Sequence, residues 1–315
     1  MSIEPKVAII VLNYNGADCL PSCLRSLHQL SYSNKEIIVV DNHSTDHSFR
    51  QVKQQFPQCI FIENKENLGF SKGMNVGIKE ALSCGAEYCL LFNYDAEIDS
   101  EALSLLVSAG EKHSHAGLLS PVVYEEEKKK IWFAQGRVLF SRMRAIHTKP
   151  SLTEQNKDTY TSNFLTGCAL LIKKELIEKI GFLDECFFLY YEDVDYSFRA
   201  REAGFDLLVV SGAKVYHREK SNENPQKVYF LVLSGLIFFQ KHTPFFLRPH
   251  IALYVRIRRA KNLFDRKVWK TPASEQVYRA YNDFFNEYPT AYFSYLRQLS
   301  ERLLSKIRSG KHLFF

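Results

Sequence analysis

Short apolar runs rich in β-branched residues recur through the first hundred residues. A polar stretch breaks each run, as Asn13-Tyr14-Asn15-Gly16 breaks the first one. Runs of this length, apolar on both faces, are typical of buried strands. The sequence therefore predicts four strands, over Val7–Leu12, Glu36–Val40, Cys59–Glu63 and Tyr88–Phe92.

The stretches between these strands predict helices. Leu20, Leu24 and Leu27 recur at helical spacing within Asp18–Leu30. Further helices are expected from Ser44 to Phe56, and from the glycine-containing loop Asn67–Gly77 to about Cys84. Strand and helix alternating at this spacing predict βαβ units. We expect an α/β fold: a Rossmann-like, mostly parallel sheet covered by helices on both faces.

The second half of the chain has a different pattern. Its expected elements are a strand over Ile131–Ala145, a polar mobile loop over Lys149–Tyr160, a buried strand over Phe164–Lys173, a helix over Lys174–Ile180, a helix ending near Ala203, and a strand pair, Asp206–Val210 with Lys214–His217. Beyond Asn222 the chain becomes helical, apolar, aromatic and basic. We therefore expect two domains, residues 1–225 and a helical C-terminal region, residues 226–315.

Polar side chains follow three of the predicted strands. Asn13 and Asn15 follow the first, Asp41 and Asn42 follow the second, and Asn93 and Asp95 follow the fourth. In parallel sheets ligands bind outside the carboxyl ends of the strands. These side chains are therefore expected to converge on one rim of the sheet.

The Asn93-Tyr94-Asp95 turn is a candidate metal site. A carboxylate beside another oxygen ligand suits a hard divalent cation that bridges phosphates, and Glu97 is a possible helper. An ordinary surface turn is the alternative. Asp41 could likewise accept hydrogen bonds from a base or ribose, or only cap a turn.

Two more segments carry candidate chemistry. In the loop Asn67–Gly77, Gly69 would let the backbone approach a ligand and Lys72 could face a phosphate, although the spacing matches neither a Walker loop nor GxGxxG. The acids in Glu192–Asp195 are either a favourable helix N-terminus or partly buried carboxyls with raised pKa values. His217 is either a metal ligand or a structural imidazole.

Taken in order, several of these motifs resemble glycosyltransferase family 2, which has the GT-A fold. The segments that carry the resemblance are VAIIVLNYNG, IIVVDNHSTD, ENLGFSKGMNVGI, LLFNYDAEI, the long block FLTGCALLIKKELIEKIGFLDECFFLYYEDVDYSFRAREAGF, and KVYHRE. They cover roughly residues 5–242, and the nearest likeness is to bacterial rhamnosyltransferase-like members.

The resemblance implies a role for each matching residue. Asp41 would bind the nucleobase, and Asn93 and Asp95 would occupy the positions of the DxD motif. Asp193, with Glu192 beside it, would be the general base, and His217 a third metal ligand. The expected donor-binding residues are Asn13, Asn15, Asp41, Asn67, Gly69, Lys72, Asn75, Asn93 and Asp95. Asn93 departs from the motif because it lacks the charge of an aspartate, which predicts weaker binding of the expected Mg²⁺ or Mn²⁺.

The implied activity is inverting transfer of a sugar from dTDP-rhamnose or a UDP-hexose. The acceptor would be a hydroxyl of a saccharide or lipid-linked molecule, in synthesis of cell-surface polysaccharide or glycolipid. Two alternatives stay open. A nucleotidyltransferase would need a basic residue just after the first strand, where none occurs before Arg25. A catalytically idle nucleotide-sugar-binding protein or scaffold is the other.

Composition adds location and partners. The chain has 315 residues, of which 46% are hydrophobic, and seven cysteines without a CxxC pair, which suits buried thiols in a reducing cytosol. No secretory signal and no apolar run of about 18 residues is seen. We expect a cytoplasmic protein.

The net charge of +6 is concentrated at one end of the chain. From Val255 onward 13 Lys/Arg stand against 5 Asp/Glu, a net +8, which leaves about −2 for the remainder. A basic tail suggests an anionic partner surface, and lipid at the inner face of the membrane is preferred here over nucleic acid. Interfacial helices over Val228–Phe239 and Phe245–Ile257 would serve this. A solvated tail and a homodimer interface are the alternatives.

Overall fold

The computed structural model describes residues 4–125, 130–218 and 225–287. The chain divides into two compact units. Unit 1 consists of Met1–Leu139 and Arg144–Asn222, and unit 2 of Phe140–Met143 and Glu223–Phe315. Nothing in the sequence had indicated that residues 140–143 group with the C-terminal helices.

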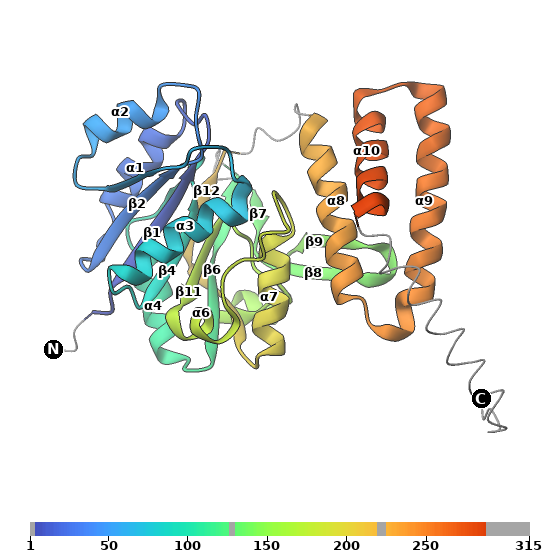
Figure 1. The fold of residues 1–315 in the computed structure, drawn as a ribbon. Coiled ribbons are helices and arrows are strands. Elements are labelled where there is room, and N and C mark those ends of the chain that lie inside the picture. The colour runs from blue at the N-terminus through green and yellow to red at the C-terminus, as the bar shows by residue number, and fades with distance from the viewer. Residues whose placement is uncertain (1–3, 126–129, 219–224, 288–315) are drawn as a thin grey trace. The chain divides into compact units, whose positions relative to one another are not determined.

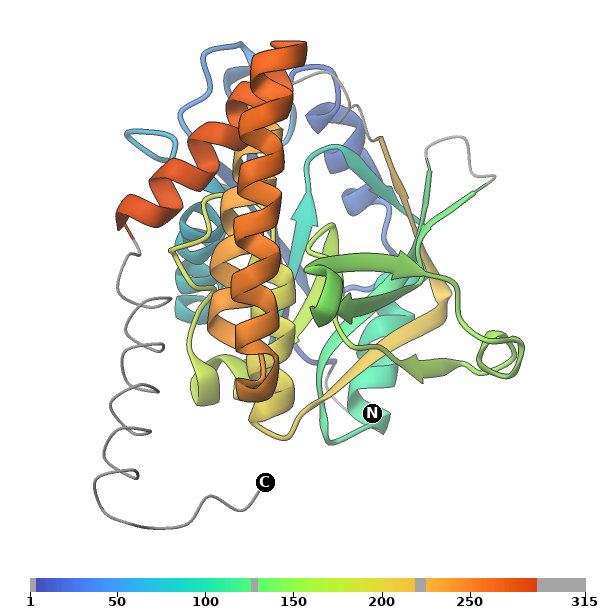
Figure 2. The ribbon, with the colours of Figure 1, turned by 90° about the vertical axis from the view of Figure 1, so that its right-hand side faces the viewer.

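Unit 1 contains one large mixed sheet (Figure 1). Its strands are β1 (Val7–Asn13), β2 (Lys35–Asp41), β3 (Ile60–Glu63), β4 (Tyr88–Asn93), β5 (Ala96–Ile98), β6 (Ala116–Glu125), β7 (Ile131–Phe133), β10 (Thr159–Thr161), β11 (Ala169–Lys173) and β12 (Asp206–His217). They follow the order β10-β12-β6-β11-β4-β1-β2-β3, with β5 beside β12 and β7 beside β6. A separate antiparallel hairpin pairs β8 (Gln135–Leu139) with β9 (Arg144–Thr148) (Figure 2).

The parallel part of the sheet is the part that the apolar runs predicted. β4, β1, β2 and β3 are parallel neighbours, and Val7 to Val11 are fully buried. The register places Asn13 opposite Asp41, and Leu12 opposite Asn93. The polar ends of three strands therefore lie side by side at one rim, as expected. Elsewhere the sheet is mixed: β11 runs antiparallel to both β4 and β6, β10 and β5 run antiparallel to β12, and β7 runs antiparallel to β6.

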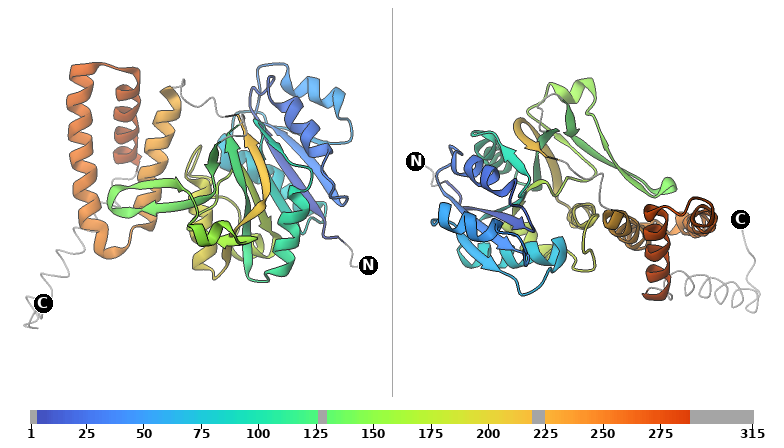
Figure 3. Two further views of the ribbon diagram at one scale, coloured as in Figure 1. Left: turned by 180° about the vertical axis from the view of Figure 1, so that it is seen from behind. Right: turned by 90° about the horizontal axis from the view of Figure 1, so that it is seen from above.

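Helices cover both faces of this sheet (Figure 3). The helices of unit 1 are α1 (Leu20–His28), α2 (Ser48–Gln55), α3 (Gly69–Ser83), α4 (Ala102–Lys112), α5 (Leu152–Gln155), α6 (Lys174–Ile180) and α7 (Glu192–Glu202). α1 and α4 share one face, where Ser31 after α1 contacts Ser104 of α4. α3 and α7 lie on the opposite face, and the loop before α7 is hydrogen-bonded to α3.

Three sequence-based expectations were wrong in detail. Ile131–Ala145 is not one strand but β7, β8 and the start of β9, with the short 3-10 helix η1 (Phe140–Arg142) between β8 and β9. Asp206–His217 is one strand, because a bulge between Val210 and Lys214 interrupts the register without ending the strand. The expected mobile loop Lys149–Tyr160 contains α5, which Ser151 and Glu154 cap reciprocally.

The described part of unit 2 contains three long helices, with α10 between the other two (Figure 1). They are α8 (Pro225–His242), α9 (Arg248–Trp269) and α10 (Pro272–Glu287), and the 3-10 helix η3 (Phe245–Leu247) precedes α9. Tyr229 of α8 donates a hydrogen bond to Asp283 of α10 at 2.8 Å, and Phe284 is fully buried. None of the described helices is both long and apolar enough to cross a bilayer.

Candidate active site

Asn13 and Asp41 form a buried polar network at the ends of β1 and β2. The Asn13 amide nitrogen donates to Asp41 Oδ1 at 2.7 Å and to Ser48 Oγ at 2.9 Å. Asp41 also accepts from the backbone N–H and the hydroxyl of Ser44. The carboxylate thus closes the turn after β2, the simpler of its two expected roles, and it is fixed for any further contact.

The chain after β1 is held against the chain after β2. Asn15, with a left-handed φ of 53°, accepts from the backbone N–H of Thr45 at 2.8 Å. Asp46 accepts from the N–H of Ala17 at 3.0 Å. Burial alone would raise the pKa of the Asp46 carboxyl, but hydrogen bonds from Ser48 and Ala17 outweigh it and lower the pKa.

Asn42 organises the glycine-containing segment. Its amide nitrogen donates to Asn67 Oδ1 at 2.9 Å and to the Gly69 carbonyl at 3.0 Å, and its oxygen accepts from the Leu68 N–H. Gly69 has a φ of +76°, and a Cβ there would lie 2.6 Å from the Phe188 carbonyl oxygen. Only glycine fits this backbone and this approach. The sequence did not indicate the part that Asn42 plays.

Three expected donor-binding residues, Gly69, Lys72 and Asn75, lie on α3 and not in a loop, because that helix begins at Gly69. Lys72 is exposed. Asn75 is buried, and its amide donates to the Leu183 carbonyl at 2.9 Å and accepts from the Leu183 N–H at 3.1 Å. Its visible contacts are therefore with the loop before α7, which suggests a positioning part for this side chain.

Asp95 and His217 are far apart in the sequence, and the fold brings them together. β5 runs antiparallel to β12 with Ala96 opposite His217, so the turn after β4 lies against the end of the last strand. His217 Nε2 lies 3.2 Å from Asp95 Oδ1. Burial, and then the Asp95 charge, raise the pKa of Tyr94, the residue before Asp95, to about 12.

This pair has the composition of a partial metal site. Asp95 Oδ1 and His217 Nδ1 are buried and lack a well-formed hydrogen bond. A carboxylate oxygen and an imidazole nitrogen at this separation can share one divalent cation. Among the described residues no group of three His, Cys, Asp or Glu side chains could hold a metal. Other ligands would have to come from Asn93, from water or from a bound anion.

Glu192 and Asp193 begin α7 after an unusual turn. Tyr190 and Tyr191 have φ values of 68° and 67°, which bulky residues rarely adopt, and such strain is concentrated at functional sites. Asp193 accepts from the Gly167 N–H and the Val194 N–H, both at 2.8 Å. Glu192 is buried, and its Oε2 has no hydrogen-bond partner in the structure.

The two carboxyls differ in their tendency to ionise. Burial, and then the charge of Asp193, raise the pKa of Glu192 well above its ordinary value. Burial also raises the pKa of Asp193, but the Gly167 and Val194 N–H groups and the nearby His147 oppose the rise. Of the two carboxyls, Asp193 is therefore the one that ionises more readily.

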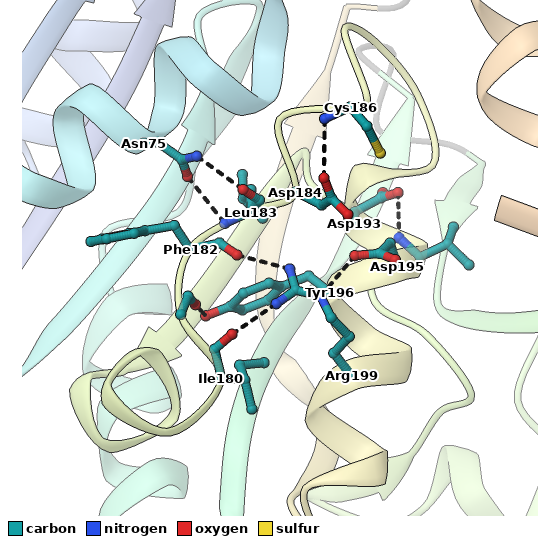
Figure 4. Close-up of polar contacts among 12 residues, drawn as sticks. Asn75, Ile180, Phe182, Leu183, Asp184, Cys186, Asp193, Asp195, Tyr196 and Arg199 are labelled. Atoms are coloured by element: carbon teal, nitrogen blue, oxygen red, sulfur yellow. Dashed lines mark hydrogen bonds and ion pairs between the residues drawn. The ribbon is translucent and has the colours of Figure 1, made fainter. Parts of the chain in front are cut away.

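The segment before α7 is fastened on two sides (Figure 4). Arg199 donates to Asp195 at 2.8 Å and to the carbonyl oxygens of Ile180 and Phe182 at 3.0 and 2.8 Å. Tyr196 donates to the Gly181 carbonyl at 3.0 Å. Asn75 holds the same segment from α3. Asp195 thus helps to hold the segment before α7 through Arg199. Asp193 has different contacts, with the N–H groups of Gly167 and Val194.

Trp132 and His147 are two site residues that the sequence did not indicate. The centroid of the Trp132 ring lies 4.6 Å from that of His147 and 4.8 Å from that of His217, and both contacts are edge-on. His147 is close enough to Asp193 to lower its pKa. In the sequence, the tryptophan beside the charged segment Glu125–Lys130 could have drawn attention to Trp132. No feature of the sequence around His147 indicates a role for it.

One short segment joins the candidate base to the candidate metal site. The Gly167 N–H bonds Asp193, and the carbonyl of the next residue, Cys168, accepts from the Asn93 N–H at 3.0 Å. A Cβ at Gly167 would also lie 3.6 Å from the Phe70 ring of α3. The acids of α7, the turn after β4 and the start of α3 therefore meet at residues 167–168.

Comparison with known proteins gives a consistent result. The family model described as "Glycosyl transferase family 2" matches residues 8–181, a little over half of the chain. The match includes Asp41 and Asp95 and ends before Asp193 and His217.

Two curated relatives and one solved structure are similar over most of the chain. The chain is 25% identical over 207 residues to the low-salt glycan biosynthesis hexosyltransferase Agl10 of Haloferax volcanii, spanning 64% of this chain and 63% of that protein. It is 23% identical over 257 residues to the dTDP-rhamnosyl transferase RfbF of Shigella flexneri, spanning 78% and 84%. The mannosyltransferase PcManGT from Pyrobaculum calidifontis, solved with GDP-Man and Mn²⁺, matches with a TM-score of 0.58 at 16% identity over 96% of this chain and 81% of that one.

Proposed function

Because the chain belongs to glycosyl transferase family 2, we propose that it transfers a sugar from a nucleoside-diphosphate sugar to an acceptor hydroxyl with inversion. The GT-A fold expected from the motifs is the fold of unit 1. One observation carries the residue assignment: Asp193 and Asn93 are hydrogen-bonded to adjacent residues, Gly167 and Cys168.

The donor is proposed to lie along the rim formed by β1, β2 and β4. Asp41, fixed by Asn13 and Ser44, offers its carboxylate edge to the base or ribose. Asn15 and the start of α3 border the same rim. We propose dTDP-rhamnose as the first donor to test, because RfbF is named as a dTDP-rhamnosyl transferase, with UDP-hexoses second.

Asp95 and His217 would hold Mg²⁺ or Mn²⁺, and Asn93 would add an uncharged ligand. Asp95 Oδ1 and His217 Nε2, 3.2 Å apart, are close enough to bind one ion, which supports this use. Such an ion, when bound, would offset the negative charge that develops on the departing nucleoside diphosphate. PcManGT, with Mn²⁺ in its structure, has a similar fold.

Asp193 is proposed to take the proton from the acceptor hydroxyl. Its two N–H donors orient the carboxylate, and its pKa, raised by burial, makes it a stronger base than an exposed aspartate. Attack from the face opposite the diphosphate inverts the anomeric centre in one displacement. Glu192, holding its proton, would not compete for the same role.

A nucleotide-sugar panel tests the proposal. Purified protein is incubated with dTDP-rhamnose, UDP-hexoses or GDP-mannose, with Mg²⁺ or Mn²⁺, and both melting temperature and nucleoside-diphosphate release are measured. We expect one donor to raise the melting temperature only with metal. Its transfer to a saccharide or lipid-linked acceptor should give the inverted anomer by NMR.

Three results would contradict the proposal in separable ways. Donor binding without release under any acceptor would favour the idle binding protein. Release of pyrophosphate from a nucleoside triphosphate would favour the nucleotidyltransferase. Retention at the anomeric carbon would remove Asp193 as the base for a single displacement.

A further inference from the structure

Helix α9 has two apolar faces, and the described part of the chain covers one of them. Ile251 and Val255 are each 1% exposed and form the face packed within unit 2. Leu253, Ile257, Phe264 and Val268 are 58%, 58%, 66% and 51% exposed. Packing inside unit 2 explains the first set, whereas no packing among residues 225–287 of that unit covers the second.

Leu263, 41% exposed, lies to one side of α9, but the other four large exposed apolar residues of the helix form one line. They are separated by four, seven and four positions, so at about 3.6 residues per turn they lie within an arc of roughly 60°. We call these four residues, Leu253, Ile257, Phe264 and Val268, the α9 stripe. Ile251 and Val255 lie about 130° and about 170° from its centre on the same helix wheel. Singly exposed apolar residues are normal, but a continuous line of them marks an interaction surface.

Basic side chains border the α9 stripe. α9 carries seven Lys/Arg and one Asp. Arg259 and Arg266 face α10, where they donate to Asn282 and Glu275. Arg256 and Lys267 lie on one side of the stripe and Lys261 on the other, and all three are exposed, Lys261 with an ion pair to Asp265 at 3.6 Å.

We propose that α9 docks the protein on an anionic lipid surface, lying in the interface with the α9 stripe toward the acyl chains. An apolar line between basic flanks is the pattern of interfacial helices, and no described helix could span the bilayer. Two phenylalanines in η3, Phe245 and Phe246, are 58% and 76% exposed just before α9 and extend the apolar surface.

Charge favours lipid over a second copy of the chain. A two-fold contact through the α9 stripe would place one strongly basic helix against another, and like charges across an interface cost several kcal/mol. An anionic bilayer instead attracts each basic residue near its surface. α8, the other helix expected at the interface, does not fit the role, because Ser234 to Phe239 are buried.

The test is vesicle co-sedimentation of the full chain, without donor or acceptor, so its outcome is independent of the proposed activity. Vesicles are phosphatidylglycerol and phosphatidylcholine at a 1:1 ratio, or phosphatidylcholine alone. We expect binding to the anionic vesicles at least tenfold tighter than to the neutral ones, and weaker binding at high salt.

Variants separate the apolar and basic contributions. Ile257→Ser with Phe264→Ser should lose at least tenfold in affinity, and Lys261→Glu with Lys267→Glu should lose the preference for anionic vesicles. Leu105→Ser on α4, 40% exposed, is the matched control and should bind as the unmodified protein. Circular dichroism and melting temperature establish that each variant is folded.

Three outcomes would overturn the proposal: equal binding to both vesicle types, unchanged binding by the folded Ile257→Ser/Phe264→Ser variant, or no binding by the unmodified protein. A dimer that this variant dissociates, seen by light scattering without vesicle binding, would assign the α9 stripe to self-association instead.

Discussion

The polar groups at the two ends of the sheet rim differ in how completely they are hydrogen-bonded. At β1 and β2, Asn13, Asp41 and Asn42 are buried and tied to one another or to the following turns. We call these three the β1–β2 network. At the other end Asp95, His217 and Glu192, with Asp193, form an acidic rim in which three side-chain atoms are buried without a well-formed hydrogen bond. In the β1–β2 network, only Asn13 Oδ1 is in that state.

This difference separates the residues proposed to position the donor from those proposed to take part in the transfer. A satisfied network is rigid and stabilises the fold, whereas unpaired buried polar groups cost free energy that substrate or metal can recover. The left-handed backbone at Tyr190 and Tyr191 adds strain on the acidic side. Substitutions in the β1–β2 network should therefore cost stability, and those in the acidic rim should cost activity.

The largest expected effect is that of Asp193→Asn. Loss of a positioned general base should lower kcat by about 10³-fold, with donor affinity changed less than twofold. Single-turnover kinetics and donor titration measure the two quantities. The acid limb of the unmodified enzyme's pH profile should lie above the ordinary aspartate pKa, because burial raises the pKa of Asp193. A variant that keeps its rate would remove this residue from catalysis.

Asp95→Ala comes next and sharpens the metal assignment. Loss of a charged ligand should weaken metal-dependent donor binding by about 10- to 100-fold. Calorimetric titration of Mn²⁺ in the presence of the nucleoside diphosphate provides the measurement, with metal-free nucleotide binding as the control. His217→Phe should have the same direction of effect. Equal Mn²⁺ affinity in all three proteins would show that the pair is structural.

Asn42→Ala removes hydrogen bonds from the β1–β2 network and tests its contribution to stability. It leaves the Leu68 N–H and the Gly69 carbonyl without their partner and should lower the free energy of unfolding by about 1–3 kcal/mol. Urea denaturation measures the change. Gln54→Ala, an exposed amide on α2, is the control and should stay within about 0.5 kcal/mol. Similar values for the two variants would mean that the network contributes little.

Glu192→Gln should have the smallest effect, and it should stabilise the folded protein at high pH and not destabilise it. The folded protein holds the Glu192 proton more tightly than the unfolded chain, so its stability falls as pH rises from the ordinary glutamate pKa towards the raised one. The amide removes that dependence, and the variant should be at least as stable as the unmodified protein at pH 8. Melting curves from pH 4 to 8 test this. A glutamine variant less stable than the unmodified protein at pH 8 would contradict a buried, protonated Glu192.

Local pattern was sufficient for the parallel half of the fold. Val7–Leu12 and Tyr88–Phe92 were predicted to within one residue, because an apolar β-branched run bounded by polar residues has few other stable uses. α4 and β6 were not predicted, and the β8–β9 hairpin was taken for one strand. The bulge in β12 depends on its partner β6 and could not be read from Ser211 to Ala213 alone.

For the candidate site, the sequence by itself determined which residues are proposed to carry chemistry, and the tertiary structure decided which of them meet. The motif order singled out Asp41, Asp95, Asp193 and His217, because carboxylates and imidazoles at strand and helix ends are chemically distinctive wherever they fall. Only the fold placed His217 3.2 Å from Asp95, added Trp132 and His147, and gave Asn75 its hydrogen bonds to Leu183. Contacts between residues more than a hundred positions apart depend on strand register and crossover geometry, which no local window of sequence contains.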